Sequence, residues 1–372
     1  MRDSFKLAAA AALVLLSAAC GPKEPAPAGT TPASGSAMSP TAATASPGGP
    51  CQLNVFIWSE YIDPAIITDF EKEFACKVTL DLYEDNESMM SKLQGGGTSL
   101  YDVVVPSQYV IPVMVKLGLL AELRHENIPN LSNLDEKFVS PVFDVGNRYS
   151  AAYQWGTIGI YLRKKPGKAV DETWALLFDK QKQYGSFLLM DSVREMMGAM
   201  AKYKGLSVNS TSLDDLRAES AALGEAKQRS QGFEGGVGGK NKVLSKAVDA
   251  AVVYNGDAVR GTTDDPETYY FVPREGGVLW VDSMAVPAKA PHRDIAEKFI
   301  NFILSAKVGA QLSNFNQYAT PNKASRAFIT PADLANTAIY PPAEMMPKLE
   351  FVNDLGDDNR LYDEVWTQVK SK

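Results

Sequence analysis

The chain has 372 residues, which is enough for two hydrophobic cores of ordinary domain size. Its formal net charge of −7 argues against nucleic acid or an anionic membrane surface as the partner, and it mildly favours cationic ligands through long-range attraction. The only two histidines, His125 and His292, do not lie at ligand spacing from any cysteine, so we expect no zinc site and no other cofactor.

The first twenty residues have the pattern of an export signal. Arg2 and Lys6 precede the apolar run 7–16, which is too short to span a bilayer comfortably. The small residues that follow end at Cys20 and resemble a bacterial lipoprotein signal, in which this cysteine is lipidated and becomes the new N-terminus. Because Ser17 stands where such signals usually carry leucine, ordinary secretory cleavage is the alternative. We expect a location in the periplasm or at the cell surface, with the membrane reached only through the lipid.

The next segment, 21–50, is rich in Pro, Ala, Gly, Ser and Thr and has almost no large apolar side chain to bury. It is expected to be a disordered tether. Two cysteines follow it, Cys51 before the first predicted strand and Cys76 before the second. If these strands are parallel neighbours, the two cysteines lie close together, and an exported protein favours a disulfide over two free thiols.

From residue 51 onward, predicted strands alternate with predicted helices. The first group has the order β-α-β-α-β, with continuous apolar strands at 53–57, 77–82 and 102–105. Such strands predict a parallel sheet covered by helices, which is the α/β class. After an irregular stretch, a second α/β region is predicted, with strands at 157–162, 186–190, 250–254, 269–272 and 278–282.

Two later segments carry specific predictions. The glycine-rich stretch 232–239 lacks the ending of a phosphate-binding loop, so we expect a mobile loop there. Helices are predicted near 292–305 and 307–314, and a surface helix is predicted at 359–370.

Aromatic and acidic residues recur where the predicted strands end. In the motif Trp58-Ser59-Glu60-Tyr61, a turn at Ser59 could aim the two rings and the carboxylate into one cavity. A ring face attracts a cation, and a carboxylate beside it supplies charge-assisted hydrogen bonds. The recurrence favours a cage for an organic cation over simple packing of a sheet edge. Its expected members are Trp58, Glu60, Tyr61, Tyr109, Glu195, Tyr254, Asp257, Trp280, Asp282 and Tyr318.

Seven short motifs, in this order and spacing, resemble the bacterial solute-binding proteins that deliver spermidine and putrescine to ABC importers. The resemblance runs from about residue 52 to the C-terminus. It rests on WSEY at 58–61, YDVVVPS at 101–107, QWG at 154–156, RE at 194–195, NG at 255–256, WVDS at 280–283 and TPN at 320–322.

The resemblance implies a two-lobed periplasmic-binding-protein fold with a hinge and with the ligand in the cleft between the lobes. Lobe I is expected at 51–155 and 281–326, and lobe II at 156–280 and 327–372, with crossovers near Trp155, Trp280 and Arg326. The expected ligand-binding residues are Trp58, Ser59, Glu60, Tyr61, Ser107, Tyr109, Glu195, Tyr254, Asp257, Trp280, Asp282 and Tyr318. The expected partners are a polyamine and the subunits of an ABC permease, and the expected state is a monomer. Capping of helix N-termini is a second interpretation of Ser107 and Glu195.

Departures from the family pattern bear on the ligand. Spermidine-preferring members carry an acid where this chain has Ser192, and a glutamine where Val352 lies. Asp257 resembles an acid that putrescine-preferring members use for a terminal ammonium. The choice between diamine and triamine therefore stays open, with a slight preference for putrescine.

Other functions are less well supported by the residues. An amine-sensing signalling module and a binding protein for a different amine-bearing nutrient both need the same closing cleft, so they stay as alternatives. An enzyme is not expected, because neither histidine lies in a recognisable triad or metal setting and no G-x-S-x-G motif occurs.

Overall fold

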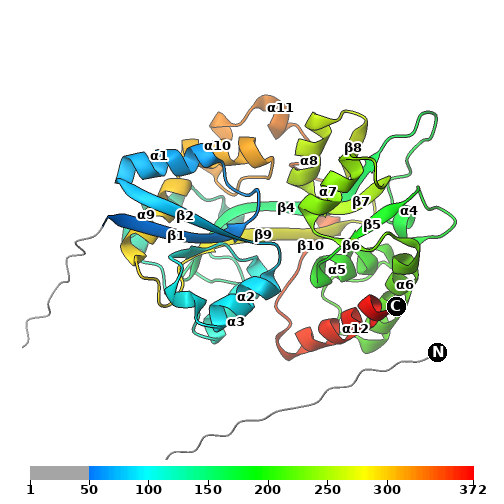
Figure 1. Cartoon of the computed structure of the whole chain (residues 1–372), viewed down its shortest axis with the longest axis horizontal. Helices are drawn as coiled ribbons and strands as arrows, with labels where there is room; N and C mark the ends of the chain where they lie inside the picture. The colour runs from blue at the N-terminus through cyan, green and yellow to red at the C-terminus, as the bar shows by residue number, and fades with distance from the viewer. Residues whose placement is uncertain (1–49) are drawn as a thin grey trace, which may run out of the picture. The chain divides into compact units, whose positions relative to one another are not determined.

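A computed structural model describes residues 50–372 (Figure 1). The predicted export signal, the lipidation site at Cys20 and nearly all of the predicted tether lie outside these described residues. Within the described part of the chain, no helix combines the length and the apolar character that crossing a membrane requires.

Ten strands form one sheet, in the order β2-β1-β3-β9-β4-β7-β5-β6, while β8 pairs with β4 and β10 pairs with β9. The strands are β1 (Cys51–Trp58), β2 (Cys76–Tyr83), β3 (Val103–Val104), β4 (Ser150–Arg163), β5 (Phe187–Met190), β6 (Phe233–Glu234), β7 (Ala250–Tyr254), β8 (Thr268–Phe271), β9 (Gly277–Ala285) and β10 (Leu349–Phe351). The α-helices are α1 (Pro64–Phe74), α2 (Asn86–Gln94), α3 (Ile111–Lys116), α4 (Ala175–Phe178), α5 (Val193–Tyr203), α6 (Leu213–Arg229), α7 (Gly236–Leu244), α8 (Asn255–Asp264), α9 (Arg293–Ile303), α10 (Ala306–Asn316), α11 (Pro331–Leu334) and α12 (Asn359–Ser371).

Two long antiparallel strands, β4 and β9, run through the middle of the molecule and connect two α/β halves (Figure 1). One half contains β1, β2 and β3 with α1, α2, α3, α9 and α10, and the other contains β5 to β8 with α4 to α8 and α12. Trp155 pairs with Val281 and Gly156 with Trp280 in the register of the two long strands. Two of the three residues expected at the crossovers, Trp155 and Trp280, therefore lie on neighbouring strands at the centre of the sheet, whereas Arg326 lies in the short 3-10 helix Lys323–Phe328.

Strand β1 shows why the apolar runs form a parallel sheet. Leu53, Val55 and Ile57 are buried in one hydrophobic cluster, whereas Phe56, on the opposite face, is buried in a second cluster. Because both faces are covered, the strand needs an apolar side chain at almost every position. The predicted parallel pairing of the first two strands is confirmed.

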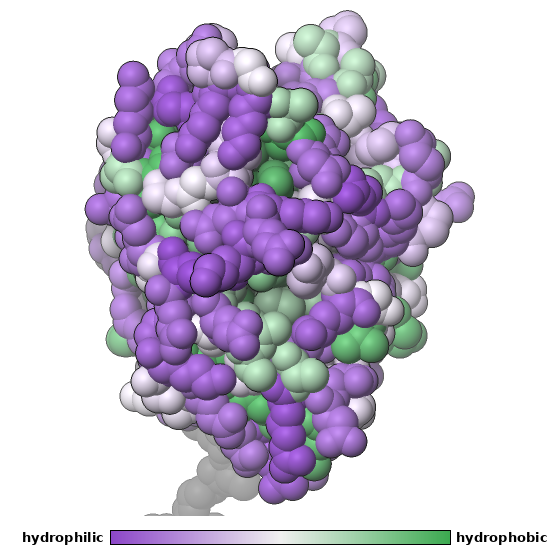
Figure 2. All heavy atoms as spheres, turned by 90° about the vertical axis from the view of Figure 1, so that its right-hand side faces the viewer, coloured by the Kyte–Doolittle hydropathy of each residue, from purple (hydrophilic) through white to green (hydrophobic). Residues whose placement is uncertain are grey.

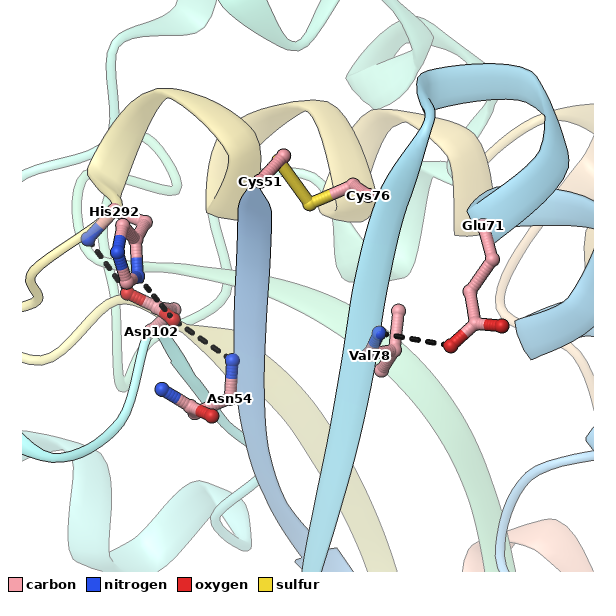
Figure 3. Close-up of a disulfide and its surroundings, with 7 residues drawn as sticks. All are labelled: Cys51, Asn54, Glu71, Cys76, Val78, Asp102 and His292. Atoms are coloured by element: carbon pink, nitrogen blue, oxygen red, sulfur yellow. Dashed lines mark hydrogen bonds and ion pairs between the residues drawn. A yellow bond between two sulfur atoms is a disulfide. The ribbon is translucent and has the colours of Figure 1, made fainter. Parts of the chain in front are cut away.

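The predicted disulfide between Cys51 and Cys76 is confirmed, and Figure 3 shows it joining the first residues of β1 and β2. The two cysteines are register partners, and their Cα atoms are 4.5 Å apart. Nearby, the buried Asp102 carboxylate accepts hydrogen bonds from the backbone N–H groups of Asn54, at 2.8 Å, and His292, at 2.7 Å (Figure 3). These contacts fix the start of β1 to the segment before α9.

The prediction of a mobile glycine-rich loop at 232–239 is wrong. Residues 233–234 form β6, which pairs with β5, and Gly236 begins helix α7. A Cβ atom at Gly239 would lie 3.2 Å from Val253 Cγ1 and 3.3 Å from the Ala251 Cβ atom of β7. Here glycine permits close packing of a helix on a strand, so tertiary packing overrides its weak helix propensity.

Figure 2 shows the end of the molecule formed by the half that contains α4, α6 and α12. Hydrophilic side chains cover most of this face, and hydrophobic side chains gather only in small separate groups (Figure 2). Helix α12, predicted as a surface helix, packs Tyr362, Val365, Trp366 and Val369 inward and leaves its other face in solvent.

A candidate ligand-binding cleft

A cavity of about 550 Å³, including its open mouth, lies beside the carboxyl ends of β1 and β7 and the middle of β9. Eleven of the twelve residues predicted to bind a ligand line it: Trp58, Ser59, Glu60, Tyr61, Ser107, Glu195, Tyr254, Asp257, Trp280, Asp282 and Tyr318. Several of these residues meet because the ends of β1, β3, β5 and β7 converge at one edge of the sheet. Trp280 and Asp282 instead lie within β9, and Tyr318 follows α10.

Aromatic rings form a continuous wall of this cavity. Trp280 contacts Tyr318 edge to face, with ring centroids 5.1 Å apart, and Tyr254 in the same manner at 5.8 Å. Tyr61 continues the row, since its ring centroid is 5.4 Å from that of Tyr318. Trp58 is held separately, because its Nε1–H donates to the Val105 carbonyl at 2.9 Å. The wall is apolar, and its ring faces are negative, which suits a methylene chain that carries cationic groups.

Asp282 lies at the base of the cavity and is buried. Its Oδ1 accepts a hydrogen bond of 2.7 Å from the Ser107 hydroxyl. Burial raises the pKa of this carboxyl to about 7, although the hydroxyl groups of Ser107 and Tyr61 oppose the rise. Beside it, Trp280 Nε1 is buried without a hydrogen-bond partner among the described residues.

Glu195 lies in the first turn of α5 and is also buried. Its carboxylate accepts a hydrogen bond from the Ser192 hydroxyl, and burial raises its pKa. The adjacent Arg194 does not pair with it, because its guanidinium donates to the Asn353 carbonyl at 3.0 Å and stacks on Tyr362. Within residues 50–372, neither Asp282 nor Glu195 forms an ion pair with a lysine or arginine.

Glu60 and Asp257, by contrast, are already paired with cations. Glu60 Oε2 lies 3.1 Å from Lys240 Nζ and 3.0 Å from Arg260 Nη2. Asp257 Oδ1 lies 2.6 Å from the same guanidinium nitrogen. Burial alone would raise the pKa of Glu60, but Lys240 and Arg260 outweigh it and hold this pKa below its ordinary value. For the more deeply buried Asp257, burial outweighs the two cations and raises the pKa.

The turn after β1 positions the side chains of Ser59 and Glu60. Glu60 has a φ angle of 53°, in the left-handed region that residues other than glycine seldom adopt. Ser59, just before it, donates its hydroxyl to Glu84, which also lines the cavity. Such strained turns are often found at binding sites, where the surrounding contacts hold them in place.

Tyr109 is the one predicted residue that does not line the cavity. Its hydroxyl accepts a hydrogen bond of 3.0 Å from the Asn86 side chain, which also donates to Ser107 at 3.1 Å. Its ring lines a neighbouring cavity that also contains Gln108 and Val352. Tyr109 is therefore linked to Ser107 only indirectly, through the Asn86 side chain, which donates to both hydroxyl groups.

Sequence reasoning missed Glu84, Gly236 and Val237 as lining residues. Glu84 directly follows β2, so the rule that strand ends carry the site would have found it. Gly236 was not expected in the site, because it belongs to the glycine-rich stretch 232–239 for which the sequence predicts a mobile loop. A Cβ atom at Gly236 would lie 2.6 Å from Tyr254 Cδ2, so only glycine allows the start of α7 to close over this ring.

Comparisons with known proteins agree with this geometry. The profile of the family "Bacterial extracellular solute-binding protein" matches residues 65–342. The spermidine/putrescine-binding periplasmic protein of Escherichia coli K12 is 32% identical over 323 residues, which cover 86% of this chain and 91% of that protein. The putrescine/cadaverine-binding protein of Pseudomonas aeruginosa is 30% identical over 332 residues, which cover 86% of this chain and 93% of that protein.

Among solved structures, a putative spermidine/putrescine ABC transporter from Listeria monocytogenes superposes with a TM-score of 0.80. It is 34% identical, and the match covers 86% of this chain and 98% of that chain. The predicted two-lobed α/β fold is thereby confirmed. The family consists of binding proteins of ABC transporters and is not a class of enzymes. The chain belongs to the bacterial extracellular solute-binding proteins.

Proposed function

We propose that this protein binds a polyamine of the putrescine and spermidine class in the aromatic and acidic cleft and delivers it to an ABC permease. One observation carries the proposal: Asp282 and Glu195 are buried carboxylates that line the cleft without a cationic partner among residues 50–372. The relatives described above, which are named as proteins that bind spermidine, putrescine or cadaverine, support the same ligand class.

The physical reason is the cost of burying charge. A carboxylate removed from water is destabilised by several kcal/mol unless an opposite charge and hydrogen bonds replace the water. An ammonium group beside Asp282 or Glu195 would provide both. The methylenes between two ammonium groups would lie against Trp280, Tyr318 and Tyr61, and Trp58 and Tyr254 would complete the walls.

We place the hinge at the middle of β4 and β9, with lobe I at 51–155 and 281–326 and lobe II at 156–280 and 327–372. With these boundaries Asp282 belongs to lobe I and Glu195 to lobe II. A diamine that bridges them favours the closed form, because an empty closed cleft would bring two like charges together. The closed, loaded monomer is the form that the permease would recognise, in the periplasm or at the cell surface, with lipidated Cys20 as its membrane anchor.

Calorimetric titration tests the ligand class. The purified protein would be unfolded and refolded to remove co-purified amine, and then titrated with putrescine, spermidine and 1,4-butanediol. We expect heat of binding with an amine and none with the diol, which matches putrescine in length but carries no charge. Absence of binding to both amines would refute the polyamine proposal and leave only the fold and family.

Uptake measurements test the transport role separately. Deleting the gene should abolish uptake of radiolabelled putrescine, and a plasmid copy should restore it. Unchanged uptake together with altered gene expression in response to amines would instead favour a sensor on the same fold.

A further inference from the structure

Four charged residues form a wall at one side of the cleft, which we call the ion cluster: Glu60, Asp257, Lys240 and Arg260. Glu60 and Asp257 line the cleft itself. Glu60, Lys240 and Arg260 also line an outer groove of about 880 Å³, including its open side. The ion cluster therefore separates the cleft from the outer groove, with its carboxylates toward the cleft.

The cations of the ion cluster are held in place by buried contacts. The Lys240 side chain is 9% exposed and the Arg260 side chain is 19% exposed. Arg260 donates from Nη1 to the Asn316 carbonyl at 2.8 Å and from Nη2 to both carboxylates. Because both side chains are largely buried and ion-paired, neither is a freely moving surface side chain.

Charge balance then divides the buried and cation-paired acids of the cleft into two groups, apart from Glu84, which is exposed and accepts the Ser59 hydroxyl. Two carboxylates meet two cations in the ion cluster, so its formal charge is zero. Asp282 and Glu195 have no such partner within residues 50–372 and offer two negative charges. A ligand with two ammonium groups matches this number, whereas a third ammonium at the ion cluster would face Lys240 and Arg260 and would have to displace an ion pair.

We propose that Lys240 and Arg260 determine the specificity of the site. By neutralising Glu60 and Asp257 and closing that side of the cleft, they make the site prefer a diamine to a triamine. This inference rests on the proposed polyamine function. It also assigns Glu60 and Asp257 to the wall of the cleft, where they hold protein cations instead of ligand ammonium groups.

The test compares putrescine and spermidine affinities of the wild type, Arg260→Gln and Lys240→Gln by calorimetry. Each substitution removes one positive charge and frees negative charge at the ion cluster. We expect the wild type to prefer putrescine, and each variant to shift the ratio of affinities toward spermidine by about tenfold or more, the effect of one partly buried charge pair. Arg217→Gln is the matched control, because Arg217 lies on α6 with a side chain that is 69% exposed.

Several outcomes would overturn the inference. A wild type that prefers spermidine would contradict it directly, and so would variants whose affinity ratio moves no further than that of the Arg217→Gln control. In both cases amine binding itself would still stand, whereas failure of the wild type to bind any amine would refute the proposed function. Thermal unfolding checks that each variant is folded. If neither variant folds, the wild-type preference between the two amines decides.

Discussion

Replacing Asp282 with asparagine removes one charge of the cleft and almost nothing else. Asparagine has nearly the same shape, and its side-chain oxygen can still accept the hydrogen bond that Ser107 donates at 2.7 Å. Because the residue is buried and faces the aromatic wall, an ammonium group at this place would lose its counter-charge without gaining water. Unpairing one member of a buried charge pair costs roughly 2–5 kcal/mol.

The expected loss of putrescine affinity is therefore between about 30-fold and several thousand-fold. Calorimetry on Asp282→Asn measures it, and Asp69→Asn, an exposed position on α1, is the control with the same change of charge. A loss below about twofold, no larger than that of the control, would remove Asp282 from the site and refute the reasoning.

The same substitution should stabilise the empty protein at high pH. Burial raises the pKa of Asp282 to about 7 in the folded state, so the wild type loses stability as the pH rises from about 4 through 7 and the buried carboxyl ionises. Asparagine does not ionise. The difference in free energy of unfolding, variant minus wild type, should therefore increase between pH 5 and pH 8, while binding falls. A difference that is equal at both pH values would show that Asp282 is not desolvated.

Three further substitutions test other parts of the account. Trp280→Leu removes the central ring of the aromatic wall and should lower putrescine affinity about fivefold to thirtyfold in calorimetry, whereas an unchanged affinity would exclude a cation–π role. Replacing Cys51 and Cys76 together by alanine should lower the free energy of unfolding by about 3 kcal/mol in denaturant titrations, with putrescine affinity unchanged; a change in affinity would mean that the disulfide shapes the cleft. Glu219 buries both carboxylate oxygens without a partner among the described residues, and burial raises its pKa to about 8. The folded protein therefore loses stability as the pH rises from about 4.5 to 8. The variant Glu219→Gln should be stabilised relative to the wild type by more at pH 8 than at pH 5. An equal effect at both pH values would contradict the burial argument.

Much of the fold could be predicted because its main signals are local. The apolar run at β1 is buried on both faces, so its composition alone indicates a strand inside a parallel sheet. Strand β2 lies at the edge of the sheet and leaves Leu80 and Leu82 exposed. Helix α1 begins at Pro64, where the Asp63 side chain accepts a hydrogen bond of 2.8 Å from the Ala65 N–H. Most of the lining residues were found for a related reason, since the carboxyl ends of parallel strands meet at one edge.

The remaining features depend on contacts that no local pattern records. A lysine at position 240 of a helix is usually solvated, and only the fold shows that it reaches Glu60 at 3.1 Å. Asp257 and Arg260 lie three residues apart on α8, which is the spacing of a helical ion pair, but that spacing does not show that the arginine also holds Glu60. Tyr109 follows the same strand as Ser107, yet its hydroxyl accepts a hydrogen bond from Asn86 and the residue does not line the cleft.

The most direct test of the central claim is a crystal structure of the protein grown with saturating putrescine. The account predicts one ammonium nitrogen within hydrogen-bond distance of Asp282 and the other within hydrogen-bond distance of Glu195, with the methylenes against Trp280 and Tyr318 and the ion cluster intact. Putrescine bound elsewhere, or an ammonium inserted between Glu60 and Arg260, would contradict it.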